Sequence, residues 1–213
     1  MTDSLFPIED TSPLLFEEQA RRRGFRAIAG IDEAGRGPLA GPVVAAAVIL
    51  PERFDLPGLT DSKKLTEKKR EELYPLIRQQ ALAVGVGLAS PRDIDRLNIL
   101  QATLLSMQTA VRRLPVVPDY LLIDGISPIR SEIPQMTIKQ GDSRSLSIAA
   151  ASVIAKVIRD RIMVSFDRHY PEFGFAGHKG YGSEAHRAAI ARCGPSPQHR
   201  YSFRGVREHV EES

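Results

Sequence analysis

The segment Val43–Leu50 has the sequence VVAAAVIL and contains no polar side chain. Its length suits one strand, and neither of its faces could be left in water, so the strand has to be buried on both sides. A strand of this kind is typical of a layered fold in which helices pack on a sheet. The segment therefore predicts an α/β architecture.

Strand and helix patterns alternate along the rest of the chain. We expect further strands at Phe25–Ile31, Ala83–Ala89, Tyr120–Ile123 and Gln135–Lys139. We expect helices at Leu14–Arg23, at Glu67–Leu82, from Ser90 along one apolar face to Leu114, at Ser145–His169 and at Glu184–Cys193. This interleaved order supports a single α/β domain built around a sheet.

The cysteine content and the terminal segments point to the cytoplasm. The single cysteine, Cys193, cannot form an internal disulfide, which favours a reducing compartment. Residues 1–13 contain acidic but no basic residues, unlike a signal peptide. The uncharged stretch Gly37–Pro51 is interrupted by prolines and is shorter than the roughly 18 residues of a spanning helix. We expect a cytoplasmic protein.

Positive charge gathers in the C-terminal part of the chain. The whole sequence has 29 basic and 26 acidic residues, a net charge of +3. Between Lys139 and Arg207 there are 12 basic and 5 acidic residues. Such a region suits a polyanionic partner such as nucleic acid, whereas the alternative is an excess of arginine that only keeps the surface soluble. Charge alone leaves both interpretations open.

Four carboxylates lie where the chain leaves or enters apolar elements. Asp32 and Glu33 follow one predicted strand, and Asp124 follows another. Asp142 precedes the long apolar helix. Clustered carboxylates at the edge of a core lose hydration and repel one another, and a divalent cation such as Mg²⁺ or Mn²⁺ relieves both costs. An alternative for Asp142 is a helix cap.

Strand geometry adds a condition for this metal site. Neighbouring side chains on a strand point to opposite faces, so Asp32 and Glu33 can share an ion only if the strand ends at Ile31. The following residues, Ala34–Pro38, supply a turn, and we expect the strand to end there. Carboxylates that hold two metal ions are typical of water attack on a phosphodiester, a reaction that needs no nucleophilic side chain.

Two glycine-rich loops are candidates for substrate contact. Gly35–Gly41 has GxGxxxG spacing with a proline after its second glycine, which excludes a dinucleotide fingerprint. Arg36 there could contact a phosphate, and the alternative is a plain tight turn. In Gly177–Ser183, Tyr181 either stacks on a nucleic acid or folds back on the core. Asp61–Lys64 either caps the next helix or brings Lys63 to phosphates.

The histidines do not have the spacing of zinc ligands. His169, His178 and His186 have no cysteine partners at ligand distance along the chain, and no HExxH motif occurs. We expect most of them to be in contact with solvent or with phosphate.

Seven segments resemble those of bacterial ribonuclease HII, in the family's order, over about Ile28 to Arg204. They are IDEAGRGPLAGPVVAAAVILP (Ile31–Pro51), DSKKL (Asp61–Leu65), LNILQATLL (Leu97–Leu105), LLIDG (Leu121–Gly125), GDSRSLSIAAASVIAKV (Gly141–Val157), GHKGYGSEAH (Gly177–His186) and GPSPQHRYSF (Gly194–Phe203).

This resemblance implies a ribonuclease H-like fold, with a five-stranded mixed sheet flanked by helices and a C-terminal helical extension. It implies one domain over 1–213, with a catalytic core at about 25–170 and a substrate-contacting extension at about 171–213. The implied activity is metal-dependent cleavage of RNA in RNA–DNA hybrids, and cleavage 5′ to single ribonucleotides in duplex DNA. The products would carry 3′-hydroxyl and 5′-phosphate ends. We expect a monomer, and the sequence itself gives no support for a replication-clamp contact.

The resemblance also implies roles for particular residues. The family's metal and catalytic carboxylates fall on Asp32, Glu33, Asp124 and Asp142. Its GRG motif, whose backbone recognises the 2′-hydroxyl of a ribonucleotide, falls on Gly35, Arg36 and Gly37. Its junction-sensing tyrosine falls on Tyr181.

The chain departs from the common family pattern at Ile126, Gln140 and Ser183, none of which is one of the four carboxylates. Two rival functions remain at this level. A non-catalytic binder of hybrids would use the same basic surface, and a nucleotide-binding α/β protein is disfavoured by the glycine spacing.

Overall fold

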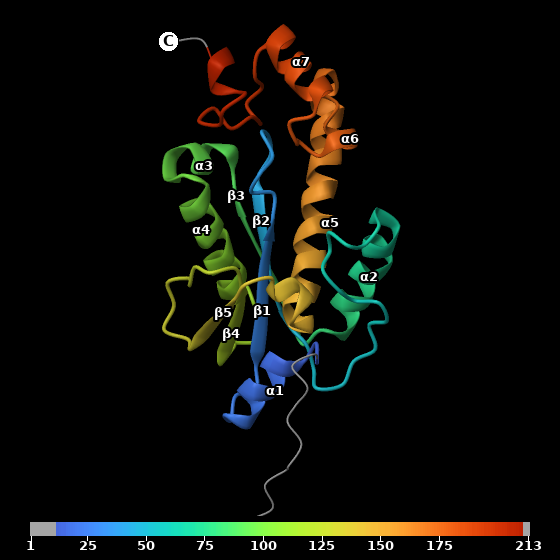
Figure 1. The fold of residues 1–213 in the computed structure, drawn as a ribbon, viewed down its shortest axis with the longest axis vertical. Coiled ribbons are helices and arrows are strands. Elements are labelled where there is room, and N and C mark those ends of the chain that lie inside the picture. The colour runs from blue at the N-terminus through green and yellow to red at the C-terminus, as the bar shows by residue number, and fades with distance from the viewer. Residues whose placement is uncertain (1–11, 211–213) are drawn as a thin grey trace, which may run out of the picture.

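Five strands form one mixed sheet in the computed structural model, which describes residues 12–210 (Figure 1). The strands are β1 (Ile28–Ala34), β2 (Val43–Ile49), β3 (Ala83–Ala89), β4 (Tyr120–Asp124) and β5 (Gln135–Ile138). Their order across the sheet is β3-β2-β1-β4-β5. The pairs β1–β2 and β2–β3 are antiparallel, whereas β4 is parallel to both β1 and β5. The predicted five-stranded mixed sheet is confirmed.

Helices cover both faces of this sheet (Figure 1). They are α1 (Leu15–Arg22), α2 (Glu67–Gln80), α3 (Pro91–Leu97), α4 (Ile99–Arg112), α5 (Leu146–His169), α6 (Phe175–His178) and α7 (Glu184–Cys193). Alternate residues of β2 pack against the two layers: Val44 and Val48 lie in one apolar cluster with α2 and α5, whereas Ala45 and Ile49 lie in another with α4. Every residue of β2 is buried, as its sequence predicts.

Strand β1 is longer than predicted. It continues through Asp32 and Glu33 to Ala34, because β2 offers it backbone partners as far as Val44. The expectation that the strand ends at Ile31 is therefore wrong. The strand alternation persists, so Asp32 shares the α5 face with Gly30, and Glu33 shares the α4 face with Ile31.

The apolar face from Leu97 to Leu114 belongs to two helices and not to one. Asn98 separates α3 from α4 with a φ of 70°, and its side chain accepts a hydrogen bond from the backbone N–H of Gln101 at 3.0 Å. Asparagine tolerates this left-handed conformation and caps helices well, so the break is compatible with a continuous apolar pattern.

Glycines bring the sheet and its helices into backbone contact. A Cβ at Gly30 of β1 would lie 2.1 Å from the backbone carbonyl carbon of Ser147 in α5. On the other face, a Cβ at Gly87 of β3 would lie 2.0 Å from the carbonyl oxygen of Ser106 in α4. Both helices can approach the sheet this closely because these positions carry no side chain.

The C-terminal segments lie beyond one end of the sheet, beside the last turns of α5 (Figure 1). They surround a separate apolar cluster that joins Leu39 and Ala40 of the first glycine loop to Met163, Phe175 and Ile190. The predicted boundary at about residue 171 stays a prediction, and residues 1–11 and 211–213 of the predicted domain lie outside the described part. No helix within residues 12–210 combines the length and the apolar character needed to cross a membrane.

Candidate active site

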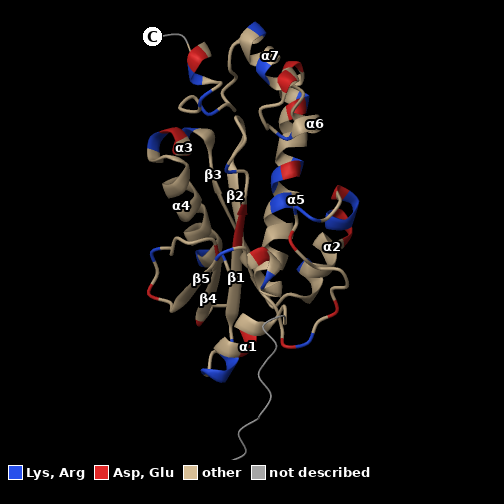
Figure 2. Ribbon diagram, in the orientation of Figure 1, with Lys and Arg blue, Asp and Glu red and all other residues tan. Residues whose placement is uncertain are grey.

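Three aspartates converge at one edge of the sheet. One carboxylate oxygen from each of Asp32, Asp124 and Asp142 lies within 4.8 Å of the others. Parallel pairing of Ile31 with Ile123 puts Asp32 and Asp124 side by side as the next residues on β1 and β4. In Figure 2 the acidic segment of β1 appears in red in the middle of a mostly uncharged sheet.

Asp142 reaches the cluster through a short turn. It lies in the 3-10 turn Gly141–Ser143, and the N–H of Gly141 donates to Oδ1 of Asp124 at 2.7 Å. Asp142 is not the cap of α5, because the side chain of Ser145 accepts the hydrogen bond from the N–H of Ile148. The capping alternative for Asp142 is thereby excluded.

The fold holds these carboxylates together against their mutual repulsion. Burial raises the pKa of Asp32 well above its ordinary value of 3.8, and the charges of Glu33 and Asp124 raise it further. Burial also raises the pKa of Asp142, with the charge of Asp124 as the next cause. Buried oxygen ligands that repel one another fit a hard divalent cation, which would favour their ionised forms.

Lys63 supplies a positive charge at the edge of this cluster. Its Nζ lies 3.3 Å from Oδ2 of Asp142, while 72% of its side chain stays exposed. Burial disfavours the charged lysine, but Asp142 and Asp32 outweigh it, so the pKa of Lys63 is raised. The segment Asp61–Lys64 does not cap α2, because Thr66 accepts the capping bond from Lys69.

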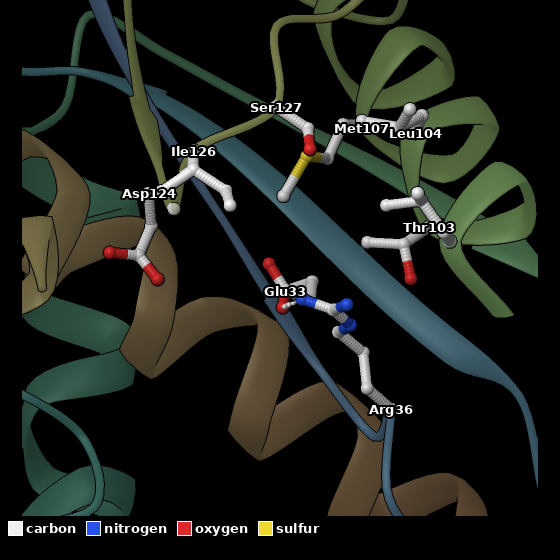
Figure 3. Close-up of a pocket in the computed structure, with 10 residues that line it drawn as sticks. Glu33, Arg36, Thr103, Leu104, Met107, Asp124, Ile126 and Ser127 are labelled. Atoms are coloured by element: carbon white, nitrogen blue, oxygen red, sulfur yellow. Dashed lines mark hydrogen bonds and ion pairs between the residues drawn. The ribbon is translucent and has the colours of Figure 1, made fainter. Parts of the chain in front are cut away.

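Glu33 lies on the opposite face of β1 and outside the group of three aspartates. Its carboxylate forms an ion pair with Nη1 of Arg36 at 3.4 Å. Together with Asp124 it lines a cavity of about 300 Å³ whose other walls include Met107 and Ile126 (Figure 3). Burial raises the pKa of Glu33, although Arg36 acts against this.

The two glycine-rich loops meet beside the aspartates. Gly35, Arg36, Gly37, Lys63 and Tyr181 all line a second cavity of about 400 Å³. The N–H of Leu39 donates to the carbonyl of Gly180, which ties one loop to the other. Tyr181 is 49% exposed, so it does not fold back on the core. Five residues predicted to contact substrate therefore line one cavity.

The expectation for the histidines is wrong for His186. His186 is fully buried and lies 3.0 Å from the buried His199, between their Nε2 atoms. His178 stacks on His186 at 4.3 Å and hydrogen-bonds the carbonyl of Phe173. These rings pack beside the apolar cluster around α6 and α7, and of the three histidines only His169 is exposed.

Sequence reasoning also missed two arginines and one aspartate. Arg159 and Arg200 are the largest fully buried side chains, and they donate to the carbonyls of Ala40 and Gly41 in the first glycine loop. The charge of Asp61 raises the pKa of Asp142, so this carboxylate belongs to the same neighbourhood. Arg200 lies in the matched segment GPSPQHRYSF, which was the available signal for it.

Comparison with known proteins identifies the family. The family model described as Ribonuclease HII matches residues 29–206. The chain is 68% identical over 206 residues to the ribonuclease HII of Syntrophotalea carbinolica, covering 97% of this chain and 99% of that protein.

Two solved structures have the same fold. Ribonuclease H2 from Pyrococcus horikoshii superposes with a TM-score of 0.71 at 27% identity, covering 85% of this chain and 95% of that one. The ribonuclease HII seen in complex with PCNA from Archaeoglobus fulgidus gives 0.68 at 25% identity, covering 88% and 97%. The predicted ribonuclease H-like fold is thereby confirmed, and the chain belongs to the ribonuclease HII family.

Proposed function

We propose that Asp32, Asp124 and Asp142 form the core of the metal site of this enzyme, and that Glu33 is its fourth carboxylate. As a ribonuclease HII, the protein is a metal-dependent endoribonuclease that hydrolyses the RNA strand of RNA–DNA hybrids and acts in removing ribonucleotides from DNA. The observation that carries the assignment is the convergence of three aspartate oxygens within 4.8 Å, with Asp32 and Asp142 buried. Glu33 is included because its charge acts on Asp32 and because it shares a cavity with Asp124.

The donor set favours Mg²⁺ or Mn²⁺, because it consists of oxygens only. When bound, two such ions would lower the pKa of an attacking water and stabilise the leaving oxygen of the phosphodiester. Asp32 and Asp124 come from adjacent strands and Asp142 from a turn held by Asp124, so the backbone fixes the ligands before any ion arrives. We expect products with 3′-hydroxyl and 5′-phosphate ends, which requires that water forms the new P–O bond while the bond from phosphorus to the 3′-oxygen breaks.

Substrate contact is proposed for the cavity between the glycine loops. The backbone of Gly35, Arg36 and Gly37 would recognise the 2′-hydroxyl of the ribonucleotide, which is the group that distinguishes RNA from DNA. Tyr181 is exposed beside this loop and would pack on the sugar of the next nucleotide. Lys63 reaches Asp142 but keeps most of its side chain in solvent, so it can meet a backbone phosphate there.

We propose that the enzyme is a monomer with a substrate-contacting C-terminal extension. One chain supplies all four carboxylates, which supports a monomeric enzyme. The separate apolar cluster around α6 and α7 supports a substrate-contacting extension that begins near residue 171. The proposed partners are RNA–DNA hybrids and duplex DNA that contains ribonucleotides.

A cleavage assay tests these assignments. A DNA duplex with one embedded ribonucleotide, an all-DNA duplex and an RNA–DNA hybrid are each incubated with Mg²⁺, Mn²⁺ or EDTA. We expect the first and third to be cut with either metal, and none to be cut in EDTA. Asp124→Asn should abolish cleavage while the fold and duplex binding persist, and Glu52→Gln, at an exposed position, should behave as wild type.

Two results would contradict the proposal. Cleavage of the all-DNA duplex would mean that the 2′-hydroxyl is not the recognised group. Wild-type turnover by Asp124→Asn would remove the metal-site assignment. The rival function, a binder without activity, predicts that hybrids are retained in EDTA and stay intact with either metal.

A further inference from the structure

Two arginines are buried in the C-terminal part of the structure without an acidic partner. Arg159 and Arg200 are 1% and 0% exposed, and neither forms an ion pair within residues 12–210. A buried charge without a counterion is costly unless every donor has a partner. Here the partners are backbone carbonyl oxygens, which means that the guanidinium groups hold the main chain.

The guanidinium of Arg200 donates hydrogen bonds to three carbonyls of the first glycine loop. Its Nη1 donates to the carbonyl of Arg36 at 2.8 Å, and its Nη2 donates to the carbonyl of Gly35. Both Nε and Nη2 donate to the carbonyl of Gly41 at 3.0 Å. The ring of Phe203 covers the guanidinium, with its centroid 5.0 Å from Cζ. Burial lowers the pKa of Arg200 to about 9, which still leaves it charged at neutral pH.

These contacts fix the direction of two amides. In a trans peptide the C=O and the following N–H point opposite ways, and no cis peptide occurs in the described residues. The carbonyls of Gly35 and Arg36 face Arg200, so the N–H groups of Arg36 and Gly37 face away from it. Both residues are exposed, and neither amide has a hydrogen-bond partner among residues 12–210. They border the cavity that Tyr181 also lines.

His199, the residue before Arg200, is linked by hydrogen bonds to the second glycine loop, which contains Tyr181. His199 bonds His186 through their Nε2 atoms, and Nδ1 of His186 lies 2.8 Å from the carbonyl of Tyr181. The segment itself is tied to the first loop, because the N–H of Arg200 donates to the carbonyl of Leu39 at 2.9 Å. One short segment therefore positions both loops of the cavity.

We propose that Arg200 is a positioning residue for ribonucleotide selectivity, because it aims the amides of Arg36 and Gly37 at the 2′-hydroxyl. This proposal rests on the proposed function of the Gly35–Gly37 backbone. Two free amides gain an acceptor from a ribonucleotide and none from a deoxynucleotide, so their direction contributes to discrimination and not to general duplex affinity. Lysine cannot replace Arg200, because its ammonium does not have the planar fork that spans three carbonyls.

Arg159 provides a matched control. It is an equally buried arginine whose guanidinium also holds main-chain carbonyls, those of Ala40, Pro42 and Lys179. It packs against Gly35 and lines the same cavity, but it makes no hydrogen bond to the carbonyls of Gly35 or Arg36, so it separates packing from carbonyl contact. Arg159→Lys and Arg200→Lys should therefore lose similar stability, while only Arg200→Lys should lose selectivity.

The experiment measures selectivity as a ratio for wild type and both variants with Mn²⁺. KM is determined for a duplex with one ribonucleotide, and Ki is determined for the same duplex in all-DNA form as a competitor. We expect Arg200→Lys to lower the ratio Ki/KM about tenfold, the effect of losing one or two neutral hydrogen bonds, with Ki itself unchanged. Arg159→Lys should keep the ratio within about twofold of wild type.

The measured ratios distinguish a failure of the Arg200 proposal from a failure of the proposed function on which it rests. A wild-type enzyme with equal Ki and KM contradicts the proposed recognition of the 2′-hydroxyl by the Gly35–Gly37 backbone before any variant is compared. A selective wild type with an equally selective Arg200→Lys overturns the inference alone, as does an equal loss in Arg159→Lys. If Arg200→Lys does not fold by circular dichroism, Phe203→Leu decides, since it uncovers the guanidinium: a lower ratio supports the proposal, and an unchanged ratio overturns it.

Discussion

Nε2 of His186 lies 3.0 Å from Nε2 of His199, so one imidazole donates to the other. The N–H of Ser196 donates to Nδ1 of His199, which assigns the proton of His199 to Nε2. His186 then accepts at Nε2 and donates from Nδ1 to the carbonyl of Tyr181. Each ring is neutral in this chain of hydrogen bonds, and a second proton on either ring would place two donors face to face.

The buried pair of His186 and His199 should make the protein less stable in mild acid. Burial lowers the pKa of both His186 and His199 from the ordinary 6.5 to about 4, and the charges of His178 and Arg187 also act on His186 in this direction. The unfolded chain therefore binds protons that the folded chain does not, so this contribution is complete above pH 6.5 and declines as the pH falls towards 4. We expect the Tm of the wild type to fall by several degrees between pH 7 and 5.

A histidine variant isolates this effect from other titrations. His199→Gln should unfold at a lower temperature at pH 7 but show a shallower decline with acid, since it removes one of the two groups. His169→Gln, at an exposed position, should keep the wild-type slope. If the Tm of all three proteins declined equally between pH 7 and 5, the buried pair would not titrate in this range of pH.

Removing one buried carboxylate should stabilise the protein without metal. The raised pKa of Asp32 means that its ionised form is disfavoured in the folded state, so the charge costs stability at pH 8. Asp32→Asn keeps an oxygen that can accept the bond from the N–H of Glu33, now made by Oδ1 of Asp32 at 2.7 Å. We expect its Tm in EDTA to rise by about 2–4 °C, and its gain in Tm from Mn²⁺ to disappear. A lower Tm in EDTA than the wild type would contradict the electrostatic account.

The glycines of the first loop should differ sharply in their tolerance of a methyl group. Gly35 has a φ of +97°, and a Cβ there would lie 2.0 Å from Nε of Arg159, whereas a Cβ at Gly37 would meet nothing nearer than Cε1 of Tyr181 at 3.9 Å. Gly35→Ala should therefore lower the free energy of unfolding by about 2–3 kcal/mol in urea titrations, and Gly37→Ala by less than about 0.5 kcal/mol. Similar losses in both would mean that the loop adjusts its backbone.

Tyr181 should matter to activity and not to stability. Its ring is 49% exposed, so Tyr181→Ala should leave the Tm within about 1 °C of wild type. Loss of one stacking contact should lower kcat/KM on a duplex with one ribonucleotide about tenfold. Tyr201→Ala removes a ring that is 39% exposed elsewhere in the C-terminal part, and it should leave kcat/KM unchanged. Equal kcat/KM for both variants would exclude a sugar contact by Tyr181.

Local patterns were sufficient to predict the layers of this fold. The apolar segment VVAAAVIL forms a strand that is buried on both faces, as predicted, and the helix expected from Ser90 begins there, with Ser90 as its N-cap. The carboxylates could be selected because each one follows or precedes an apolar run. The glycine spacing drew attention to the two loops, and the family motifs then assigned roles to Gly35, Arg36, Gly37 and Tyr181.

Features that depend on distant partners could not be predicted. Where β1 ends depends on how far β2 pairs with it, which the local sequence does not indicate. A strand ending at Ile31 would have allowed Asp32 and Glu33 to share an ion, but the longer strand places Glu33 on the opposite face from Asp32. His186 is buried because His199 satisfies its ring, and nothing in the local sequence indicates that contact. The break at Asn98 leaves the apolar periodicity intact, which is why the pattern alone suggested one helix.

The contact between Gly30 and Ser147 has a consequence for the order in which the enzyme matures. Asp32 lies two residues beyond Gly30, and Asp142 lies just before α5, so their distance depends on the backbone of β1 meeting the backbone of α5. That contact joins segments far apart in the sequence and forms only when the chain has collapsed into its final packing. A nascent or unfolded chain therefore has no assembled set of carboxylates, and the proposed metal site would exist only in the folded protein.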